Sequence, residues 1–427
     1  MIQELRSYIK NSWDKALNEK KDGELVLPYP FIPPCIEGDF RVLYYWDTYF
    51  TNIGLIIDGK KEYAKNNVDD LLFALDHFGC VPNYTRDDGA KFCSQPPFLR
   101  LMIEDVYKAT NDKEWHQNAL LKLEKEYAFW MKERMSPIGL NQYGTNAKLL
   151  SDLVEYYGYV SGRIPLPQDI PDEAKAEKAK NFLAEAESGE DFTPRYRDHN
   201  ALDYVQIDLN AHLYGVEEYL AHCYENVDEE KSKYYSEKKE ERLKLLRRYC
   251  YDEKTGQYYD YDFKRKERND IVCCACFLPY FYGFAQDPKG VKSIYERLKT
   301  KGGVVACEDT GDRSYQWGYP NIWAPHQYFA YVALQKYGYG QEAEELRLGY
   351  IKLLEKEYDK TGRLWERYDE NGIAKGLEYE TQPMLGWTAG VYAFFTRTVL
   401  GITAIEPDMK RSSKSDGCND DGATFEE

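Results

Sequence analysis

Four acidic residues stand out among the 73 of this sequence because aromatic or glycine residues flank them. They are Asp47 in "YYWDTYF", Asp191 in "ESGEDF", Glu366 in "LWERYD" and Glu378 in "GLEYET". An aromatic ring can stack on the apolar face of a sugar while a neighbouring carboxylate accepts hydrogen bonds from the sugar hydroxyls. The combination therefore predicts carbohydrate binding. The alternatives are a solvated surface carboxylate and, for Asp47, the N-cap of a helix.

The stretch "YQWGYPNIWAPHQY", residues 315–328, points to the same chemistry. It is rich in aromatic rings, and amide side chains such as Gln316 interrupt them. A sugar presents an apolar C–H face and a rim of hydroxyls, so flat rings and amide groups in one place suit it. Ordinary core packing is an equally open interpretation of this stretch alone.

Bulk composition argues against several classes of partner. The 427 residues carry 56 basic and 73 acidic side chains, a net charge of −17, whereas nucleic acids and anionic membranes attract basic surfaces. The chain opens with an amphipathic pattern rather than a secretion leader, and no apolar run approaches the length of a membrane span. Ten scattered cysteines suit a reducing compartment. We therefore expect a cytoplasmic protein whose partner is a small carbohydrate.

No pattern predicts a metal or a cofactor. The only cysteine cluster, Cys273–Cys276, lies in the apolar run "IVCCACFLPYFYGF", which favours buried small side chains over a metal site. Three histidines fall near the motifs, namely His199, His212 and His326, and a pair of histidines could serve a sugar epimerase. Hydrogen-bonded structural roles explain each of them as well.

Helical periodicity dominates the elements that must position these residues. It predicts helices at about 3–20, 60–78, 96–110, 113–134, 145–160, 171–188, 205–225, 229–249, 288–299, 322–338, 340–357 and 386–400, with a further apolar helix after Asp47. The segments 251–263 and 358–372 each place a D-x-x-T-G or D-x-T-G turn before an aromatic stretch, which indicates hairpins. We expect an all-α toroid of paired helices over 1–403 and a disordered tail over 404–427.

Five segments resemble, in the right order, the signatures of the trehalases, glycoside hydrolase family 37. "FRVLYYWDTYFTNIGL" is similar to G-R-F-R-E followed by Y-Y-W-D-S-Y-F, and "QWGYPNIWAP" to Q-W-D-Y-P-N-G-W-A-P. "GCVPNYTRDDGAKFCSQPPF", "AESGEDFTPRY" and "GLEYETQPMLGWTAGV" resemble three further family stretches. The resemblance spans about residues 30–400. It implies an (α/α)6 toroid with short hairpins in the loops and an inverting glycosidase that cleaves an α-linked glucoside.

The resemblance also implies roles for individual residues. Asp191 matches the general acid of the family and Glu366 its general base, while Glu378 matches a further carboxylate of the pocket. In an inverting enzyme one carboxyl group protonates the leaving oxygen and the other activates water. Arg41, Trp46, Asp47, Asn83, Gln95 and Gly189 match residues of the substrate site, and we expect Arg195, Gln316, Trp317 and Trp323 to line it as well.

The departures from the family pattern concern the second sugar. Asp39 and Cys93 stand where the family has arginine, Glu190 replaces the Trp before the acid, and Gly318 replaces the Asp of Q-W-D. No counterpart of the family's R-P-E-S is present. Arginine offers a planar bidentate donor that none of these residues reproduces. Another α-glucoside or an α-mannoside, such as glucosylglycerate or a disaccharide other than trehalose, therefore stays open as substrate, as do a non-catalytic sugar-binding protein and a sugar epimerase.

Overall fold

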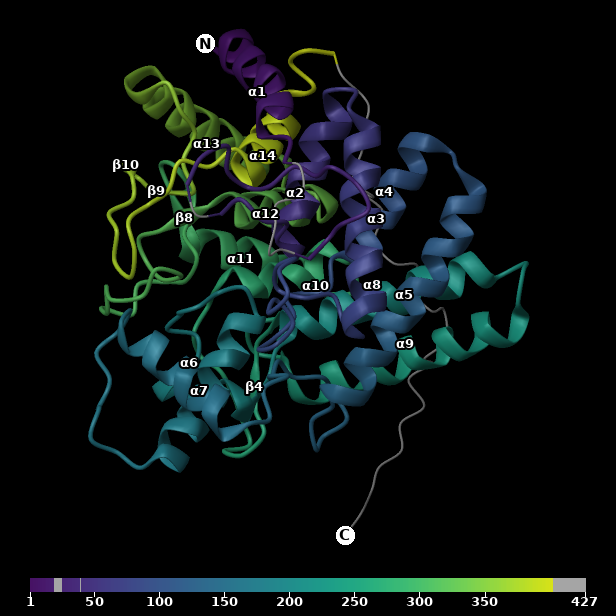
Figure 1. Cartoon of the computed structure of the whole chain (residues 1–427), viewed down its shortest axis with the longest axis vertical. Helices are drawn as coiled ribbons and strands as arrows, with labels where there is room; N and C mark the ends of the chain where they lie inside the picture. The colour runs from purple at the N-terminus through teal and green to yellow at the C-terminus, as the bar shows by residue number, and fades with distance from the viewer. Residues whose placement is uncertain (19–24, 39, 402–427) are drawn as a thin grey trace.

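The computed structural model describes residues 1–18, 25–38 and 40–401, and the predicted tail at 404–427 lies outside them. The described residues form fourteen α-helices (Figure 1). These are α1 (Ile2–Ala16), α2 (Tyr45–Ile57), α3 (Lys61–Phe78), α4 (Leu99–Thr110), α5 (Lys113–Glu133), α6 (Leu150–Ser161), α7 (Asp172–Glu187), α8 (Ile207–Tyr224), α9 (Glu229–Tyr249), α10 (Leu278–Phe281), α11 (Pro288–Leu298), α12 (Ala324–Lys336), α13 (Gly340–Thr361) and α14 (Gly386–Thr396).

Six of these helices close into an inner ring. Helix α2 packs against α4, α4 against α8, α8 against α10, α10 against α12, α12 against α14, and α14 returns to α2. An outer helix precedes each inner one, in the pairs α1–α2, α3–α4, α5–α8, α9–α10, α11–α12 and α13–α14. The described residues thus form the predicted (α/α)6 toroid.

The two layers differ in sequence because they differ in burial. Every residue of α2 and of α14 is buried, whereas the outer helix α9 buries only four of its residues. A helix surrounded by protein is apolar on all sides, and a surface helix keeps only an apolar stripe. The ring closes tightly where α2 meets α14. A Cβ atom at Gly390 would lie 1.8 Å from the Phe50 carbonyl oxygen, so only glycine permits this approach.

Helices α6 and α7 form a hairpin inserted between α5 and α8 (Figure 1). They share a small apolar cluster separate from the main core of the ring. Its buried members are Ala147, Leu153, Tyr156, Tyr157, Val160, Ala176, Ala179, Phe182, Leu183 and Phe192. Phe192 follows Asp191 directly, so the packing of this hairpin extends to the predicted general acid.

The strands are short and all lie in loops. They are β1 (Tyr204–Val205), β2 (Tyr251–Asp252), β3 (Gln257–Tyr258), β4 (Tyr261–Asp262), β5 (Glu267–Arg268), β6 (Lys299–Thr300), β7 (Gly303–Val304), β8 (Ile322–Trp323), β9 (Arg367–Asp369) and β10 (Gly372–Ile373). Strands β8, β9 and β10 form one antiparallel sheet, with Trp323 opposite Arg367. This pairing joins the segment 315–328 to the segment that carries Glu366.

Some local predictions need correction. The turn at residues 253–256 connects β2 to β3 as predicted. The segment 358–372 also leads into a hairpin, formed by β9 and β10, but the turn at 359–362 is not its turn, because Gly362 caps α13 at φ +67°. Helix α10 was not predicted, since it lies within an apolar run and shows no polar face to the solvent. The boundaries of α1 and α6 also differ, because α1 ends at Ala16 and α6 begins at Leu150.

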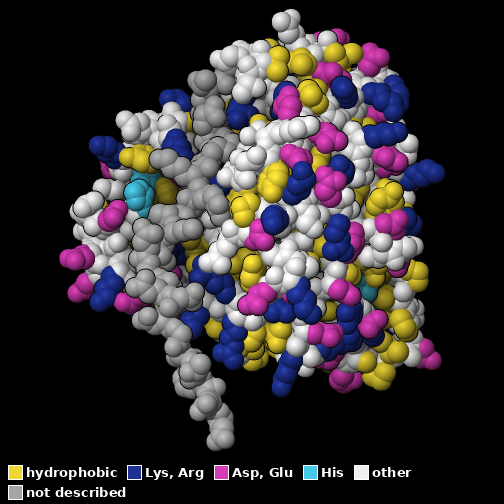
Figure 2. Space-filling model, turned by 180° about the vertical axis from the view of Figure 1, so that it is seen from behind, with side chains coloured by type: hydrophobic (Ala, Val, Ile, Leu, Met, Phe, Trp, Pro, Cys, Tyr) yellow, Lys and Arg dark blue, Asp and Glu magenta, His cyan; other side chains and the backbone are white. Residues whose placement is uncertain are grey.

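The surface mixes charges of both signs. On the face shown in Figure 2, Lys and Arg side chains are interspersed with Asp and Glu side chains. Among the described residues, no helix combines the length and the apolar character needed to cross a membrane.

Candidate functional site

A cavity of about 690 Å³ opens beside the inner ring. Part of its lining lies at or just ahead of the N-termini of inner helices, and part comes from the helices α6 and α7. Trp46 and Asp47 belong to the first turn of α2, and Gln95 precedes α4. The cavity brings together ten predicted residues: Trp46, Asp47, Asn83, Gln95, Gly189, Asp191, Gln316, Trp317, Glu366 and Glu378.

Tryptophan rings form the apolar part of the lining. The ring of Trp46 lies 5.7 Å from that of Trp317 and 5.6 Å from that of Trp387. Gly189 has φ +78°, and a Cβ atom there would lie 2.9 Å from the Trp46 ring. Glycine is therefore required at Gly189 both by its backbone conformation and by the ring beside it. These rings offer flat faces suited to a sugar.

Glu366 lies on this lining with its two oxygens in different surroundings. Its Oε1 accepts a hydrogen bond of 2.6 Å from the hydroxyl of Tyr379. Its Oε2 has no hydrogen-bond partner among the described residues and lies 3.7 Å from Nη1 of Arg367. Burial raises the pKa of Glu366 and Asp191 raises it further, whereas Arg367 and Tyr379 lower it. One oxygen is thus anchored, and the other is left for a ligand or a water molecule.

The side chain of Asp191 is also anchored through only one of its two oxygens. Nη1 of Arg163 donates to its Oδ2 at 2.6 Å, while Nη2 of Arg163 and Nε2 of Gln316 both donate to its main-chain oxygen at 2.9 Å. Its side chain is 26% exposed, and no hydrogen bond from a described residue reaches Oδ1. The same Nη2 of Arg163 also donates to Glu378. Burial, partly offset by Arg163, raises the pKa of Glu378 to about 7.

Asp47 does not cap a helix. The N-cap of α2 is Tyr44, and Asp47 lies inside the first turn with its carboxyl group at the cavity. Burial raises the pKa of Asp47 to about 8, with a smaller contribution from the charge of Glu366. The carboxyl group is therefore mainly neutral at pH 7, so it can donate one hydrogen bond to a sugar hydroxyl and accept another.

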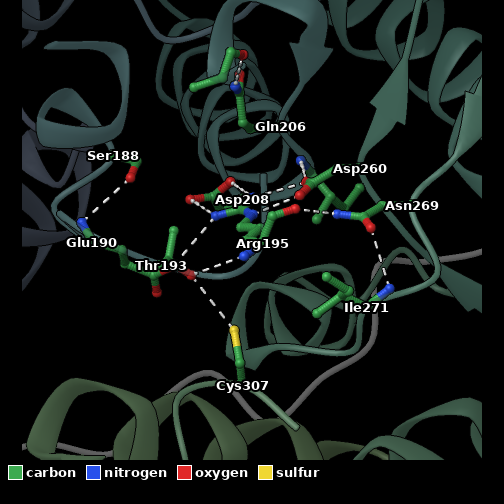
Figure 3. A network of polar contacts seen from close by, with 12 residues as sticks. Ser188, Glu190, Thr193, Arg195, Gln206, Asp208, Asp260, Asn269, Ile271 and Cys307 are labelled. Carbon is green, nitrogen blue, oxygen red and sulfur yellow. Dashed lines mark hydrogen bonds and ion pairs between the residues drawn. The ribbon is translucent and has the colours of Figure 1, made fainter. Parts of the chain in front are cut away.

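Three predicted residues do not line the cavity. Arg195 is completely buried behind it, where Nη2 lies 2.5 Å from Asp208 and Nε 2.5 Å from Asp260 (Figure 3). Its main-chain oxygen accepts a hydrogen bond from Asn269. Because both ends of its guanidinium group are committed to carboxylates, Arg195 anchors the loop that carries Asp191 instead of contacting a sugar.

The other two residues also lie outside the lining. The ring of Trp323 stacks on that of Trp317 at 3.7 Å and donates from Nε1 to the main-chain oxygen of Gln316. It supports the lining from behind. Arg41 lies 3.5 Å from the side-chain oxygen of Asn18 and outside the cavity lining. Residue 39, the other position where the family has arginine, lies outside the described residues.

Several lining residues were not predicted from the sequence. Arg163, Tyr379 and Trp387 belong to the cavity, as do Tyr156 and Tyr159 of α6. Trp387 carried a usable signal, because it lies in the first turn of an apolar helix, as Trp46 does. Arg163 carried no signal in the sequence. Its partners Asp191 and Glu378 are 28 and 215 positions away along the chain, so its contacts depend on how the α6–α7 hairpin packs.

The histidines and the cysteine cluster lie elsewhere. No histidine of the described residues lines the cavity. His199 contacts Glu185, His212 contacts Tyr282, and His326 contacts Glu190. Cys273–Cys276 are buried, and the described residues contain no group of three or more His, Cys, Asp or Glu side chains placed to hold a metal ion.

Comparison with known proteins decides the family. The family model described as Trehalase matches residues 2–399, nearly the whole chain. The protein belongs to the trehalase family. It is therefore a glycosidase, and its substrates are small carbohydrates.

Individual relatives support this assignment. The chain is 30% identical over 420 residues to the periplasmic trehalase of Salmonella dublin, which covers 91% of this chain and 72% of the relative. The neutral trehalase Nth1 of Saccharomyces cerevisiae superposes with a TM-score of 0.74 at 25% identity, over 94% of this chain and 82% of that one. A mannosylglycerate hydrolase from Thermus thermophilus shares the fold, with a TM-score of 0.63 at 16% identity over 92% of this chain and all of the other.

The relatives contradict the expected cytoplasmic location. Periplasmic trehalases of Salmonella, Pseudomonas aeruginosa and Escherichia coli match about nine tenths of this chain at 29–31% identity. The cysteine composition that suggested the cytoplasm is a weak guide, because buried cysteines behave as small apolar side chains in either compartment.

Cys93 and Glu190, two of the residues that depart from the trehalase family pattern, can be placed relative to the cavity. Cys93 is buried at the cavity, and burial raises the pKa of its thiol, so it supplies no charge there. Glu190 points behind the cavity, where its carboxyl group lies 2.9 Å from Nε2 of His326 and 3.6 Å from Nη1 of Arg195. Neither residue replaces a cationic donor toward a second sugar.

Proposed function

We propose that this protein is an inverting hydrolase of an α-linked glucoside, with Asp191 as general acid and Glu366 as general base. The observation that carries this proposal is that both carboxyl groups reach one aromatic-lined cavity, each with one oxygen anchored and the other without a protein partner. Glycosidases use two carboxyl groups that flank the glycosidic bond, and the inverting mechanism is what the resemblance to the trehalase signatures implies.

The free oxygens fit this division of roles. Burial raises the pKa of Glu366, and the hydroxyl of Tyr379 and the nearby charge of Arg367 oppose this shift, so they favour the ionised form that a general base needs. Its unpartnered Oε2 can then accept a proton from the attacking water. Oδ1 of Asp191 can donate a proton to the leaving oxygen while Oδ2 stays anchored. Both roles are general acid–base catalysis.

The first sugar fits the part of the cavity around Trp46. Its ring supplies a stacking face, and the neutral carboxyl group of Asp47 beside it supplies a donor and an acceptor. Asn83 and Gln95 add amide groups to the same lining, although Oε1 of Gln95 already accepts from the amide of Trp46. We assign these residues, with Gly189, Gln316 and Trp317, to substrate binding.

Substitution of the two carboxyl groups tests the mechanism. Asp191→Asn and Glu366→Gln should each lower kcat by about 10²–10⁴-fold, because each removes one proton-transfer group. Unchanged circular dichroism and melting temperature serve as the fold control. NMR of the first-formed product should show the anomer opposite to that of the substrate. Wild-type rates in either variant, or retention of configuration, would contradict the proposal.

Substrate choice is a separate prediction. Because Cys93 is an uncharged buried thiol, the cavity lacks at that position the bidentate cationic donor that the family pattern places there. Trehalose should therefore have a lower kcat/KM than some other α-glucoside in a panel that includes disaccharides, glucosylglycerate and the matching α-mannosides. Efficient hydrolysis of trehalose alone would contradict this prediction and leave the mechanism above unaffected.

A further inference from the structure

Arg163 belongs to none of the sequence motifs, yet it contacts two of the carboxyl groups in the cavity. It lies at the end of α6, directly after the C-cap residue Gly162. Its guanidinium group reaches the side chain of Asp191, the main chain of Asp191 and the side chain of Glu378. Only 11% of its side chain is exposed. We propose that Arg163 is the positioning residue of the general acid, and this proposal rests on the function proposed above.

The contacts restrict the acid at two points. Nη1 holds Oδ2 of Asp191, and Nη2 holds the main-chain oxygen of the same residue. The planar guanidinium group fixes both contacts relative to each other, which a lysine could not do. The side chain of Asp191 therefore has little freedom to rotate. Its Oδ1 keeps one orientation toward the cavity, where the leaving oxygen would lie.

Glu378 completes the arrangement from the opposite side. Its Oε2 accepts from Arg163, while its Oε1 lies 3.3 Å from the amide nitrogen of Phe192. The carboxyl group thus bridges the arginine and the residue that follows the acid. Its side chain is 1% exposed, so water does not compete for these contacts. Glu378 acts as a second support for Asp191.

The α6–α7 hairpin makes these contacts rigid. Val160 of α6 and Phe192 beside the acid belong to the same buried apolar cluster. The guanidinium carbon of Arg163 lies 4.9 Å from the centre of the Phe192 ring. One small core therefore fixes both the arginine and the backbone that carries the acid. This explains why an insertion between the two helices of one ring pair can contribute to the geometry of the catalytic site.

A positioning role has a distinct kinetic signature. A general acid matters when the leaving oxygen is basic and must be protonated, and it matters little when the leaving group departs as a stable anion. A residue that acts through Asp191 must show the same dependence on the leaving group as Asp191 itself. A residue that only binds sugar or stabilises the fold would affect all substrates alike.

The experiment compares Arg163→Gln with the wild type on three probes: methyl α-glucoside, 4-nitrophenyl α-glucoside and α-glucosyl fluoride. We expect kcat to fall by about tenfold to a hundredfold on the methyl glucoside, which is the loss of rate that a small misplacement of a catalytic group causes. On the fluoride, kcat should stay within a few-fold of the wild-type value. Arg163→Lys, which keeps the charge but loses the planar pair of donors, should show the same pattern to a smaller degree.

Two further variants make the result decisive. Arg86 is another cationic side chain of the cavity lining, and the described residues form no ion pair with it. The effect of Arg86→Gln on kcat should therefore not depend on the leaving group. Asp191→Asn should show the steepest dependence. Equal losses on all three probes in both Arg163 variants would overturn the positioning role while leaving Asp191 as the acid. Equal losses in Asp191→Asn would instead overturn the proposed function.

Discussion

Asp47 shows how the surroundings of a single carboxyl group determine its chemistry. The residue is 6% exposed at the cavity, and its pKa of about 8 keeps it mainly protonated at neutral pH. A protonated carboxyl group donates one hydrogen bond and accepts another, as an amide does. We had expected an ionised group that accepts from two hydroxyls. Because the protonated group resembles an amide, replacement of Asp47 by alanine and by asparagine should affect sugar binding differently.

Asp47→Ala should lower kcat/KM by at least about a hundredfold, roughly 2.7 kcal/mol, because the sugar hydroxyls lose their partners in an enclosed site. Asp47→Asn should lose much less, since the amide keeps a donor and an acceptor. Steady-state kinetics of the two variants at pH 7 test this, with the melting temperature as control. Equal losses in both would show that the ionised form is needed. A destabilised Asp47→Ala variant with near-normal kcat/KM would contradict the binding role altogether.

The aromatic segment 315–328 divides between the site and the packing behind it. Gln316 and Trp317 line the cavity, while Trp323 supports Trp317 from behind. Gln327 exchanges two hydrogen bonds with the main chain of Val304, so its amide group serves the fold. The sequence shows which residue types gather here. It does not show which of two stacked tryptophans faces the cavity, because that depends on the pairing of β8 with β9.

At the scale of elements, every helix except α10 corresponds to a predicted segment, including the fully buried α2 and α14. Their length gives the helical period enough residues to show in the sequence. Helix α10 has only four residues, all of them buried within an apolar run, so it shows no such period. The contacts of Arg163 were missed for a related reason. They depend on tertiary packing of the α6–α7 hairpin, which leaves no local pattern in the sequence.

The loop that carries the acid depends on an element-level anchor. Arg195 joins this loop to Asp208 at the start of α8 and to Asp260 after β3 (Figure 3). All three side chains are buried. Removing one partner from a buried ion pair leaves uncompensated charge, which typically costs about 3–5 kcal/mol.

We therefore expect Arg195→Met to lower the free energy of unfolding in urea by about 3–5 kcal/mol and to reduce kcat with little change in KM. Arg313→Met is the matched control. Arg313 also pairs with a carboxylate, Asp309, but on the exposed surface, where such a pair contributes little to stability. Unchanged stability together with a raised KM in Arg195→Met would contradict the structural role and indicate that Arg195 binds the substrate.

At the scale of the whole molecule, the toroid buries carboxyl groups far from the cavity as well. Asp70 on the outer helix α3 is fully buried, and Tyr29 donates its amide to Oδ1 at 3.0 Å. Its Oδ2 has no hydrogen-bond partner among the described residues. Burial raises the pKa of Asp70 from 3.8 to about 8. The raised pKa values of Asp47 and Glu126, also about 8, have the same cause.

These groups set how stability depends on pH. The folded state holds the proton of Asp70 more tightly than the unfolded state does, so the stability contributed by the protonated group is complete below pH 3.8 and is lost as the pH rises toward about 8. The melting temperature of the wild type should therefore fall between about pH 4 and pH 8. Asp70→Asn, which resembles the protonated acid, should weaken this fall without changing kcat/KM, because Asp70 does not line the cavity.

Asp14→Asn gives the opposite control. Asp14 is largely exposed, and its hydrogen bond from Lys60 lowers its pKa, so its contribution is lost only as the pH falls below its ordinary range. This variant should change the melting temperature by the same small amount at about pH 5 and pH 8. Scanning calorimetry of the three proteins across this range decides the matter. The same fall in Asp70→Asn and in the wild type would show that Asp70 does not cause the pH dependence. In that case the fall in melting temperature would arise from the other buried carboxyl groups. Asp47 and Glu126 would then be the next residues to substitute.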